Sequence, residues 1–231
     1  METEKYKFKT ELHMHTSPAS SCGRVPPAEA VKRYKDIGYD SVVIVNHFFL
    51  QERFGGSKEK FMTAYLKDFD EACEAGAKLG INVILGCEIR FAECINDYLL
   101  YGIDREFLFE AYEYLDKGIE NFSKNFKGGD MLILQAHPFR DGMTDFPSEL
   151  LDGIETFNMH HGHNSRIAVA VKYAKEHNMI TCAGSDFHDP GYEGLAAMLT
   201  KTKMTNSFEV ADVLRKKDRI FEIGGAAIVL D

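Results

Sequence analysis

Two short motifs near opposite ends of the chain carry residue types that bind metal ions. His13 and His15 follow a stretch that alternates polar and apolar residues, and Asp186 and His188 follow an apolar stretch. In an extended strand, residues i and i+2 point to the same side of the sheet. Each motif therefore presents its two side chains on one face. Three imidazoles and a carboxylate held at strand ends favour a metal centre, and a hydrolytic one in particular.

The composition is that of an ordinary globular protein. The 231 residues are 45% hydrophobic and 27% charged, and 27 basic against 36 acidic residues give a net charge of −9. This balance argues against a protein that coats nucleic acid, whose basic face would dominate the count. It is compatible with a small phosphorylated substrate, because bound divalent cations reverse the local sign of a site.

Cysteine usage and hydropathy predict a cytoplasmic protein with no membrane partner. The five cysteines form no CxxC pair, and we expect them to be free thiols in a reducing compartment. The N-terminal residues are charged and lack an apolar signal core, and no apolar run approaches membrane-spanning length. Nothing in the sequence indicates an oligomeric state.

Short apolar runs alternate with longer helical patterns along the chain. Strands are predicted at 6–12, 41–46, 81–86, 97–102, 131–136, 153–157, 179–184 and 219–223, and helices at 27–34, 58–79, 105–125, 164–177 and 208–217. This order predicts a parallel sheet with helices outside it. Roughly seven such units, without a repeat or a long linker, predict one α/β domain over residues 1–231 that is related to the (β/α)8 barrel.

The candidate ligands share one position relative to the predicted strands. They lie at the carboxyl ends, where a parallel barrel builds its active site. Random placement would put most such residues in helices or at strand starts. The residues concerned are His13, His15, His47, Glu88, His137, Asp186 and His188.

Five segments, in this order, resemble the motifs of the PHP family, named for polymerase and histidinol phosphatase. They are Glu11–Thr16 with its HxH, Asn46–His47, Gly86–Ile89 with its GxE, Ala136–Arg140 with its AHPxR, and Gly184–His188 with its SDxH. The resemblance runs from residue 11 to about 190, which is most of the chain. Any one of these motifs is weak, but five in the right order are a strong signal.

The resemblance implies a distorted (β/α)7 TIM-like barrel with two to three divalent metal ions at the carboxyl ends of its strands. By the family pattern, a first metal would be held by His13, His15, Glu88 and Asp186. Glu88 would bridge to a second metal that His137 also holds. His47 and His188 would hold a third. Mixed imidazole and carboxylate ligands suit Zn, Mn or Fe and do not choose among them.

This chain departs from the family pattern at three places. Asn46 stands where an aspartate usually precedes the histidine, and Cys22 lies in the stretch where an acidic residue often follows the HxH motif. Asp97 lies where a histidine often follows the GxE motif. The first site is therefore complete, and Asp97 or Cys22 could serve as ligands at the other two.

Other polar residues are candidates for contact with a substrate. Arg140 follows His137 closely, and its fork of donors matches phosphate oxygens. Arg24, Arg90 and Arg166 are further candidates near strand ends, although surface salt bridges would explain Arg24 and Arg90 at least as well. Within His160–His163, His160 is our candidate for substrate contact, with Asn164 as a helix N-cap. Glu155 and Asn158 are expected to support the loops around the metals.

These residues predict hydrolysis of a phosphoester, with a small phosphorylated metabolite or nucleotide as substrate. The metals would activate a water for attack and neutralise charge on the phosphoryl group, and Arg140 would hold one of its oxygens. A protonated His188 or His47 would assist the leaving group if the third metal is absent.

Two alternatives remain open on the sequence. The first is hydrolysis of a C–N bond of the amidohydrolase type, although no lysine lies at a predicted strand end to bridge metals. The second is a metal-bearing binding module with little turnover, to which the missing acidic residues give weight.

Overall fold

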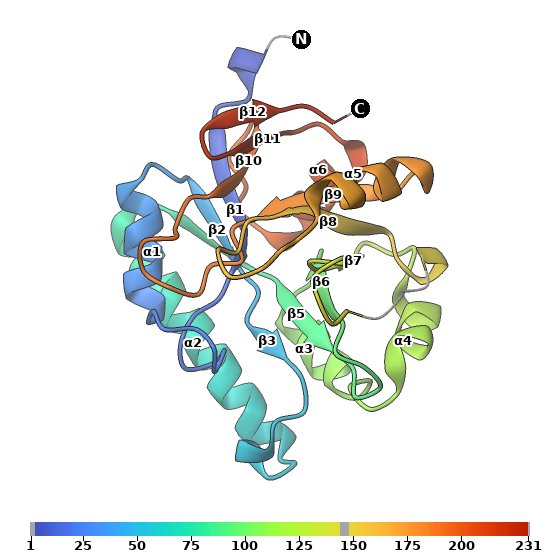
Figure 1. The fold of residues 1–231 in the computed structure, drawn as a ribbon. Helices are drawn as coiled ribbons and strands as arrows, with labels where there is room; N and C mark the ends of the chain where they lie inside the picture. Colours follow the sequence, from blue (N-terminus) through green and yellow to red (C-terminus); the bar gives the residue numbers. More distant parts are fainter. Residues whose placement is uncertain (1–2, 144–147, 231) are drawn as a thin grey trace.

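A computed structural model describes residues 3–143 and 148–230, which form a mixed α/β fold (Figure 1). The strands are β1 (Phe8–Met14), β2 (Ser41–Ile44), β3 (His47–Phe48), β4 (Asn82–Leu85), β5 (Cys87–Arg90), β6 (Asp97–Tyr101), β7 (Leu132–Gln135), β8 (Gly153–Asn158), β9 (Ile180–Gly184), β10 (Ala196–Thr200), β11 (Ile220–Ile223) and β12 (Ala226–Ile228). The helices are α1 (Pro27–Asp36), α2 (Lys58–Leu79), α3 (Arg105–Tyr112), α4 (Gly118–Phe126), α5 (Ile167–Glu176) and α6 (Ser207–Lys216). Short 3-10 turns lie at Thr3–Lys5, Glu52–Phe54 and Ser148–Leu150.

The strands form two six-stranded sheets. One has the order β12-β11-β10-β1-β2-β4, and the other has the order β3-β5-β6-β7-β8-β9. The prediction of a parallel sheet is wrong in part, because β6 pairs antiparallel with both β5 and β7, and β10 pairs antiparallel with β1. Only residues 91–96 separate β5 from β6, and so short a connection leaves no room for the crossover helix that parallel strands need.

The two sheets meet where single stretches of chain run from one into the other. β2 continues into β3 and β4 continues into β5, with backbone hydrogen bonds from Gly86 N to Ile44 O (2.9 Å) and from Glu88 N to Asn46 O (3.3 Å) across the change of sheet. The sheets also meet after the ends of β1 and β9, where Phe187 N donates to His13 O (3.0 Å) and His15 N donates to Phe187 O (3.1 Å). The ends of β1 and β9 therefore lie side by side.

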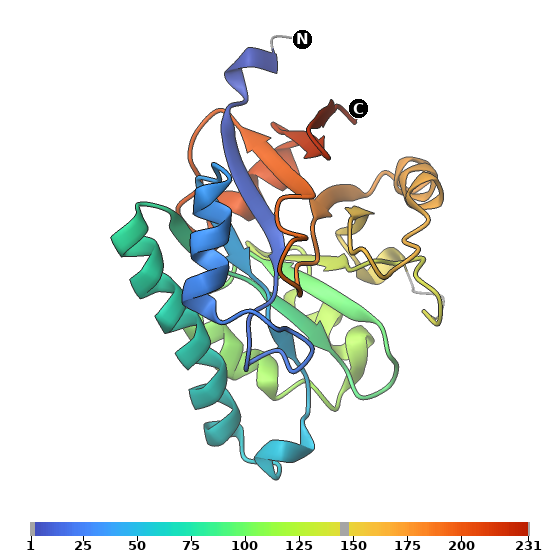
Figure 2. The same cartoon turned by 60° about the vertical axis from the view of Figure 1, so that its left-hand side comes forward.

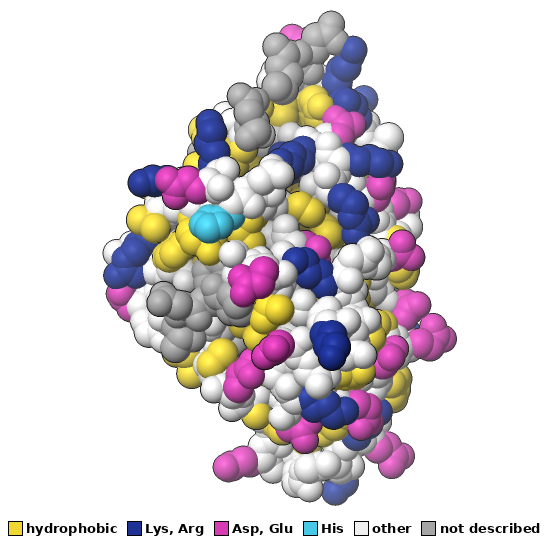
Figure 3. Space-filling model, turned by 90° about the vertical axis from the view of Figure 1, so that its right-hand side faces the viewer, with side chains coloured by type: hydrophobic (Ala, Val, Ile, Leu, Met, Phe, Trp, Pro, Cys, Tyr) yellow, Lys and Arg dark blue, Asp and Glu magenta, His cyan; other side chains and the backbone are white. Residues whose placement is uncertain are grey.

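Helices cover the strands on their outer sides. α1 and α2 pack against each other beside β1, β2 and β4, as Figures 1 and 2 both show. The apolar positions that recur along α2 are buried as the sequence predicts: Phe61, Met62, Tyr65, Phe69 and Ala72. Both figures place the described ends of the chain at the same end of the molecule. On the face shown in Figure 3, acidic and basic side chains are interspersed.

Two helix predictions differ from the structure. The helix expected over 105–125 ends at Tyr112 and a second one starts at Gly118, whose φ of +80° is a left-handed backbone that interrupts a helix. The helix expected from Asn164 begins instead at Ile167, with Arg166 as its N-cap. Among the described residues, no helix is long and apolar enough to cross a membrane.

Candidate metal centre

Four side chains from three distant segments converge at the carboxyl ends of β1 and β9. His13 Nε2 lies 3.0 Å from His15 Nε2, 3.4 Å from Glu88 Oε1 and 3.3 Å from Asp186 Oδ1. His15 Nε2 lies 3.4 Å from both Glu88 Oε2 and Asp186 Oδ1. His13, His15 and Glu88 are fully buried, and Asp186 is 2% exposed. The spacing of i and i+2 on β1 therefore places both imidazoles on one face, as the sequence predicts.

These separations fit a small divalent cation. Ligands at about 2.0–2.2 Å from a tetrahedral ion are about 3.3–3.6 Å from one another. Most of the distances above fall in this range without any movement of the side chains. The residues present therefore fit a metal ion at this point.

Hydrogen bonds on the outer nitrogens turn both Nε2 atoms inward. His13 Nδ1 lies 2.8 Å from Glu155 Oε1, a carboxylate oxygen that can only accept. His15 Nδ1 lies 3.0 Å from Ser20 Oγ, whose own proton goes to Asn46 Oδ1 at 2.9 Å. Both Nδ1 atoms are thus donors, so in the neutral imidazoles both Nε2 lone pairs face each other and need a cation between them.

In the metal-free protein, a proton supplies that positive charge. Burial alone would lower the pKa of His13, but the carboxylates of Glu155, Asp186 and Glu88 raise it well above its usual value. Burial and the neighbouring imidazoles of His188 and His47 hold the pKa of His15 well below its usual value. One proton shared at this point is what a bound divalent ion would displace.

Glu88 connects this group to two further sets of side chains. Its Oε1 lies 3.2 Å from His137 Nε2, and its Oε2 lies 2.7 Å from His47 Nδ1. Burial would raise the pKa of Glu88, but His47 and His13 hold it well below its usual value. His137 Nε2 is also 3.8 Å from Asp97 Oδ2. The Glu88 carboxylate therefore faces four imidazoles, those of His13, His15, His47 and His137, as a metal-bridging residue would.

Several buried atoms of this cluster have no hydrogen-bond partner among the described residues. They are Glu88 Oε2, His47 Nδ1, His137 Nδ1 and His163 Nδ1. Unpaired buried polar atoms are costly and call for an explanation. Ligation of metal ions by Glu88 and His47 would supply one.

A third set lies at the mouth of the cluster. His15, His47 and His188 each offer a nitrogen within the spacing that could hold an ion. His188 Nδ1 lies 2.9 Å from the Asp186 carbonyl oxygen, which leaves its Nε2 facing Cys22 Sγ at 3.1 Å. Burial would raise the pKa of the Cys22 thiol, but hydrogen bonds with His188 and His47 lower it to about 6.

Glu155 and Asn158, both on β8, support the ligands as expected. Besides His13, Glu155 accepts hydrogen bonds from His137 N (3.0 Å) and Asn158 Nδ2 (2.9 Å). Asn158 Nδ2 also donates to Asp186 Oδ2 at 3.0 Å. The ends of β1, β7, β8 and β9 are thus tied together by one buried carboxylate and one amide.

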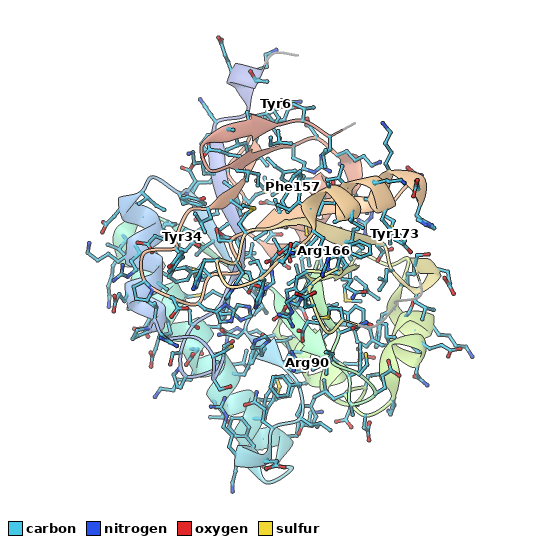
Figure 4. All side chains as sticks on the ribbon, in the orientation of Figure 1. Tyr6, Tyr34, Arg90, Phe157, Arg166 and Tyr173 are labelled. Carbon is cyan, nitrogen blue, oxygen red and sulfur yellow. The ribbon has the colours of Figure 1, made fainter. Side chains whose placement is uncertain are left out.

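Glu11 is a supporting residue to which the sequence motifs assign no role. Its carboxylate accepts from His13 N (2.9 Å), Ser185 N (2.9 Å), Ser185 Oγ (2.5 Å) and Tyr34 OH (2.9 Å). Tyr34 lies on α1 and is labelled in Figure 4. The alternation that aligns His13 with His15 also puts Glu11 on the same face of β1, so the sequence held this signal.

The Asn46 side chain forms hydrogen bonds with the loop after β1 rather than with the candidate metal ligands. Its Oδ1 accepts from Thr16 N (2.7 Å) and Ser20 Oγ, and its Nδ2 donates to Thr16 Oγ1 (2.8 Å). These bonds fix the loop after β1 and, through Ser20, the orientation of the His15 ring. The amide therefore holds the loop in place without adding charge to the site.

Two of the candidate ligands have unusual backbone conformations. His137 has φ of +31° and Asp186 has φ of +49°. A non-glycine residue in the left-handed region is uncommon and carries strain of about 1–3 kcal/mol when the conformation is sparsely populated. Such strain gathers at functional sites, and each residue lies two positions after the end of a strand of the second sheet, β7 or β9.

A pocket of about 240 Å³ opens onto the cluster and is rich in cations. Its lining includes Arg24, Arg90 and Arg140 beside the imidazoles of His47, His137, His160, His163 and His188. Arg90, at the end of β5 (Figure 4), donates to Asp97 at 2.7 and 2.8 Å, and Arg140 lies 3.9 Å from the same carboxylate. Arg24 pairs with Asp189 at 3.1 Å. Arg166 instead pairs with Asp141 and is not among the lining residues described.

The structure brings the seven predicted ligand residues together, along with Arg140 and His160. His160 stacks on His163 with ring centroids 3.8 Å apart. His163 Nδ1 lies 3.6 Å from Asp186 Oδ2, a contact that the sequence does not single out among neighbouring histidines. Asp97 contacts Arg90 and His137, so it lies beside the second set as the departure from the family pattern suggests.

Comparison with known families agrees with this arrangement. The sequence matches the family model of the PHP domain over residues 11–158, which is more than half of the chain. The chain therefore belongs to the PHP family. No curated protein sequence matches it significantly.

Solved structures with the same fold share little sequence with this chain. A two-domain protein from Bacteroides vulgatus that contains a predicted PHP-like metal-dependent phosphoesterase has a TM-score of 0.70 at 18% identity. The match covers 95% of this chain but 66% of that one, so this chain spans just under two thirds of that protein. A predicted metal-dependent phosphoesterase from Bifidobacterium adolescentis has a TM-score of 0.54 at 17% identity, with 90% and 96% covered.

An amidohydrolase from Chromobacterium violaceum, solved with bound sulfate and no metal, is also similar. Its TM-score is 0.52 at 16% identity, and the match covers 79% of this chain and 88% of that one. At these identities the likeness shows the fold.

Proposed function

We propose that this protein hydrolyses a phosphoester of a small phosphorylated substrate with the help of two to three divalent metal ions. The observation that carries the proposal is the convergence of His13, His15, Glu88 and Asp186 at the spacing of metal ligands, beneath a pocket lined by arginines. Family membership and the phosphoesterase neighbours support it.

Within this proposal, β1 to β9 form one distorted seven-stranded barrel over a single domain, with β2–β3 and β4–β5 each counted as one strand. The backbone bonds between Phe187 and the end of β1, and the continuity of β2 with β3 and of β4 with β5, favour that arrangement. The first metal would be held by His13, His15, Glu88 and Asp186, and the second by Glu88 and His137 with Asp97 nearby. His47 and His188 would hold the third. Bound ions would supply Lewis acidity and a water of lowered pKa for attack on phosphorus.

The protein's own side chains would bind and orient the phosphoryl group. Arg140 is held near Asp97 and presents its guanidinium to the pocket, where it would hold a non-bridging oxygen. Burial lowers the pKa of His160 to about 4, so its imidazole is neutral near pH 7. Its Nδ1 accepts from Gly162 N at 3.0 Å, so Nε2 carries the proton and can donate a hydrogen bond to a substrate oxygen.

His47 and His188 would act as acids only when they do not hold a metal. Burial would lower the pKa of His47, but Glu88 and Cys22 raise it to about 10. Cys22 and Asp186 raise the pKa of His188 against the effect of burial. Either protonated ring would give its proton to the leaving oxygen in a form of the enzyme with two metals.

Pocket size and charge favour a small phosphate ester over the alternatives. A volume of about 240 Å³ lies below the usual range of drug-sized ligand sites, which is about 300–1,000 Å³. Arg140, whose contact with Asp97 is as long as 3.9 Å, matches a phosphate dianion better than a neutral amide. No lysine lines this pocket among the described residues, so the bridging lysine expected of an amidohydrolase has no counterpart there.

The test combines elemental analysis of the purified protein with turnover of p-nitrophenyl phosphate before and after chelation. We expect two or more divalent ions per chain and turnover that chelation abolishes and re-added Zn or Mn restores. His13→Ala and Asp186→Ala should each lose metal and turnover while the circular dichroism spectrum is unchanged. His177→Ala is the matched control, because this ring stacks on Tyr173 at 4.2 Å and is not part of the cluster.

Retained turnover in either ligand variant would contradict the proposal. Bound metal with no turnover of any phosphoester would favour a binding module. Turnover of an anilide analogue but not of the ester would favour C–N hydrolysis.

A further inference from the structure

Cys22 lies against the outermost imidazoles of the cluster, and its place is fixed by the backbone. Its Sγ is 3.1 Å from His188 Nε2. Arg24, two residues further along, donates its backbone N–H to the His188 carbonyl at 2.9 Å, and Gly23 N donates to Ser20 O at 3.1 Å. His47 N in turn donates to Ser20 Oγ at 3.0 Å. One short loop therefore holds Cys22, His47 and His188 in register.

Two buried polar atoms beside this loop lack a hydrogen-bond partner among the described residues. His47 Nδ1 lies 2.7 Å from Glu88 Oε2, yet both atoms lack a partner with hydrogen-bond geometry among the described residues. Glu88 is fully buried, and this oxygen lies against the outer imidazole of His47 and, at 3.4 Å, the inner imidazole of His15. Two buried ligand atoms that lie close together without hydrogen-bond geometry, beside a thiol and a second imidazole, fit a cation site.

The thiol is open to solvent while the imidazoles behind it are mostly buried. Cys22 is exposed, whereas Cys87 and Cys182 are buried in the core. Cys22 also lines the pocket with His47 and His188, so an ion that enters the pocket reaches all three residues. His188 is 9% exposed, so its Nε2 is reached from the same side.

We propose that Cys22, His47 and His188 form a thiolate-containing outer metal site that selects thiophilic divalent ions over Mn2+. The inference rests on the proposed metal centre and adds to it the identity of the outer ligand. On binding, the S–H bond breaks, its proton passes to solvent, and the sulfur electron pair forms the bond to the metal. No change of oxidation state is involved.

A sulfur ligand changes which metal this protein would take. Soft thiolates favour Zn2+ and Co2+, whereas carboxylate and water ligands suit Mn2+ and Mg2+. The inner group of two imidazoles and two carboxylates does not discriminate strongly. The outer site would therefore be filled by Zn2+ or Co2+ and left poorly filled by Mn2+.

The experiment uses Co2+, whose spectrum distinguishes sulfur ligands from nitrogen and oxygen ligands. The full-length metal-free protein is titrated with Co2+ while the near-ultraviolet and visible spectra are recorded. We expect visible ligand-field bands together with a near-ultraviolet thiolate-to-cobalt charge-transfer band. Cys22→Ser should lose the charge-transfer band and one equivalent of bound metal but keep the visible bands. Cys22→Asp should also lose that band, and it should bind Mn2+ at the outer site, which the wild type does only poorly.

Cys73→Ser is the matched control, because Cys73 is a half-buried thiol on α2 and should leave the spectrum unchanged. A second readout is alkylation by iodoacetamide followed by mass spectrometry. Zn2+ should protect Cys22 and leave the labelling of Cys94 unaltered, and Mn2+ should protect neither.

Visible bands without a charge-transfer band, or a charge-transfer band that survives in Cys22→Ser, would overturn the outer site and leave the inner centre standing. The thiol and the two imidazoles would then be a hydrogen-bonded loop contact only. No Co2+ binding by the wild-type protein would overturn the metal centre itself and, with it, the function proposed above.

Discussion

Glu155→Gln tests whether the buried carboxylate behind His13 sets the strength of the first metal site. Glu155 is 1% exposed and accepts hydrogen bonds from His13 Nδ1, His137 N and Asn158 Nδ2 at 2.8–3.0 Å. A glutamine of the same shape has one accepting oxygen in place of two, and its amide N–H groups would face at least one of these donors. The negative charge that favours a cation at His13 Nε2 would also be lost.

The size of the effect follows from these contacts. A hydrogen bond to a charged group contributes about 1.5–3 kcal/mol. At 1.4 kcal/mol per factor of ten, this corresponds to about a 10- to 100-fold loss of metal affinity. Partners that orient metal-bound histidines have effects of the same order, about 10–100-fold.

The assay is a competition titration of the metal-free protein with Zn2+ against a chromophoric chelator. Glu176→Gln is the matched control, because this exposed carboxylate on α5 pairs only loosely with Lys172 at 3.7 Å. We expect the control to bind as the wild type does. If Glu155→Gln keeps wild-type affinity within twofold while its circular dichroism is unchanged, the orienting role assigned to Glu155 is refuted.

Two further predictions concern the stability of the metal-free protein, measured by urea unfolding. Burial raises the pKa of Glu11 from 4.5 to about 7, so its stabilising contribution is complete below about pH 4.5 and is lost as pH rises through 7, by about 3 kcal/mol. Glu11→Gln should flatten this part of the pH profile, and a profile parallel to that of the wild type would contradict the reasoning. Gly184→Ala would place its Cβ 2.3 Å from His13 Cβ and should cost about 1–3 kcal/mol, whereas Gly129→Ala, with its nearest contact at 3.6 Å, should be nearly neutral. Equal stability of the two alanine variants would show that β9 can move away from β1.

The sequence is most informative where local spacing decides the geometry. His13 and His15 lie on one face in the structure, as their i and i+2 spacing predicts, because the chain is extended in β1 as far as Met14. Apolar periodicity likewise identifies the buried side of α2, from Phe61 to Ala72. These properties depend on a few consecutive residues, so they are visible without knowledge of the rest of the chain.

The sequence is least informative where partners are far apart along the chain. The direction of β6 depends on a short loop rather than on its own residues, and β10 was not predicted, because a short strand has little periodicity of its own. Ser185 meets Glu11 across 174 positions, and Cys22 meets His188 across 166. Such pairs become apparent only when both sheets are in place.

The charge of the proposed outer site connects two departures from the family pattern, Asn46 and Cys22. Neutral imidazoles from His47 and His188 supply lone pairs but no negative charge to balance a divalent ion. Asn46 supplies none either, since its amide is consumed by Thr16 and Ser20, and Glu88 is shared with the inner group. Among the described residues, Cys22 is the other ionisable group beside both rings, and its hydrogen bonds with them lower the pKa of its thiol. The amide thus keeps the structural bonds of the loop after β1, and in the proposed outer site the thiolate would supply the negative charge.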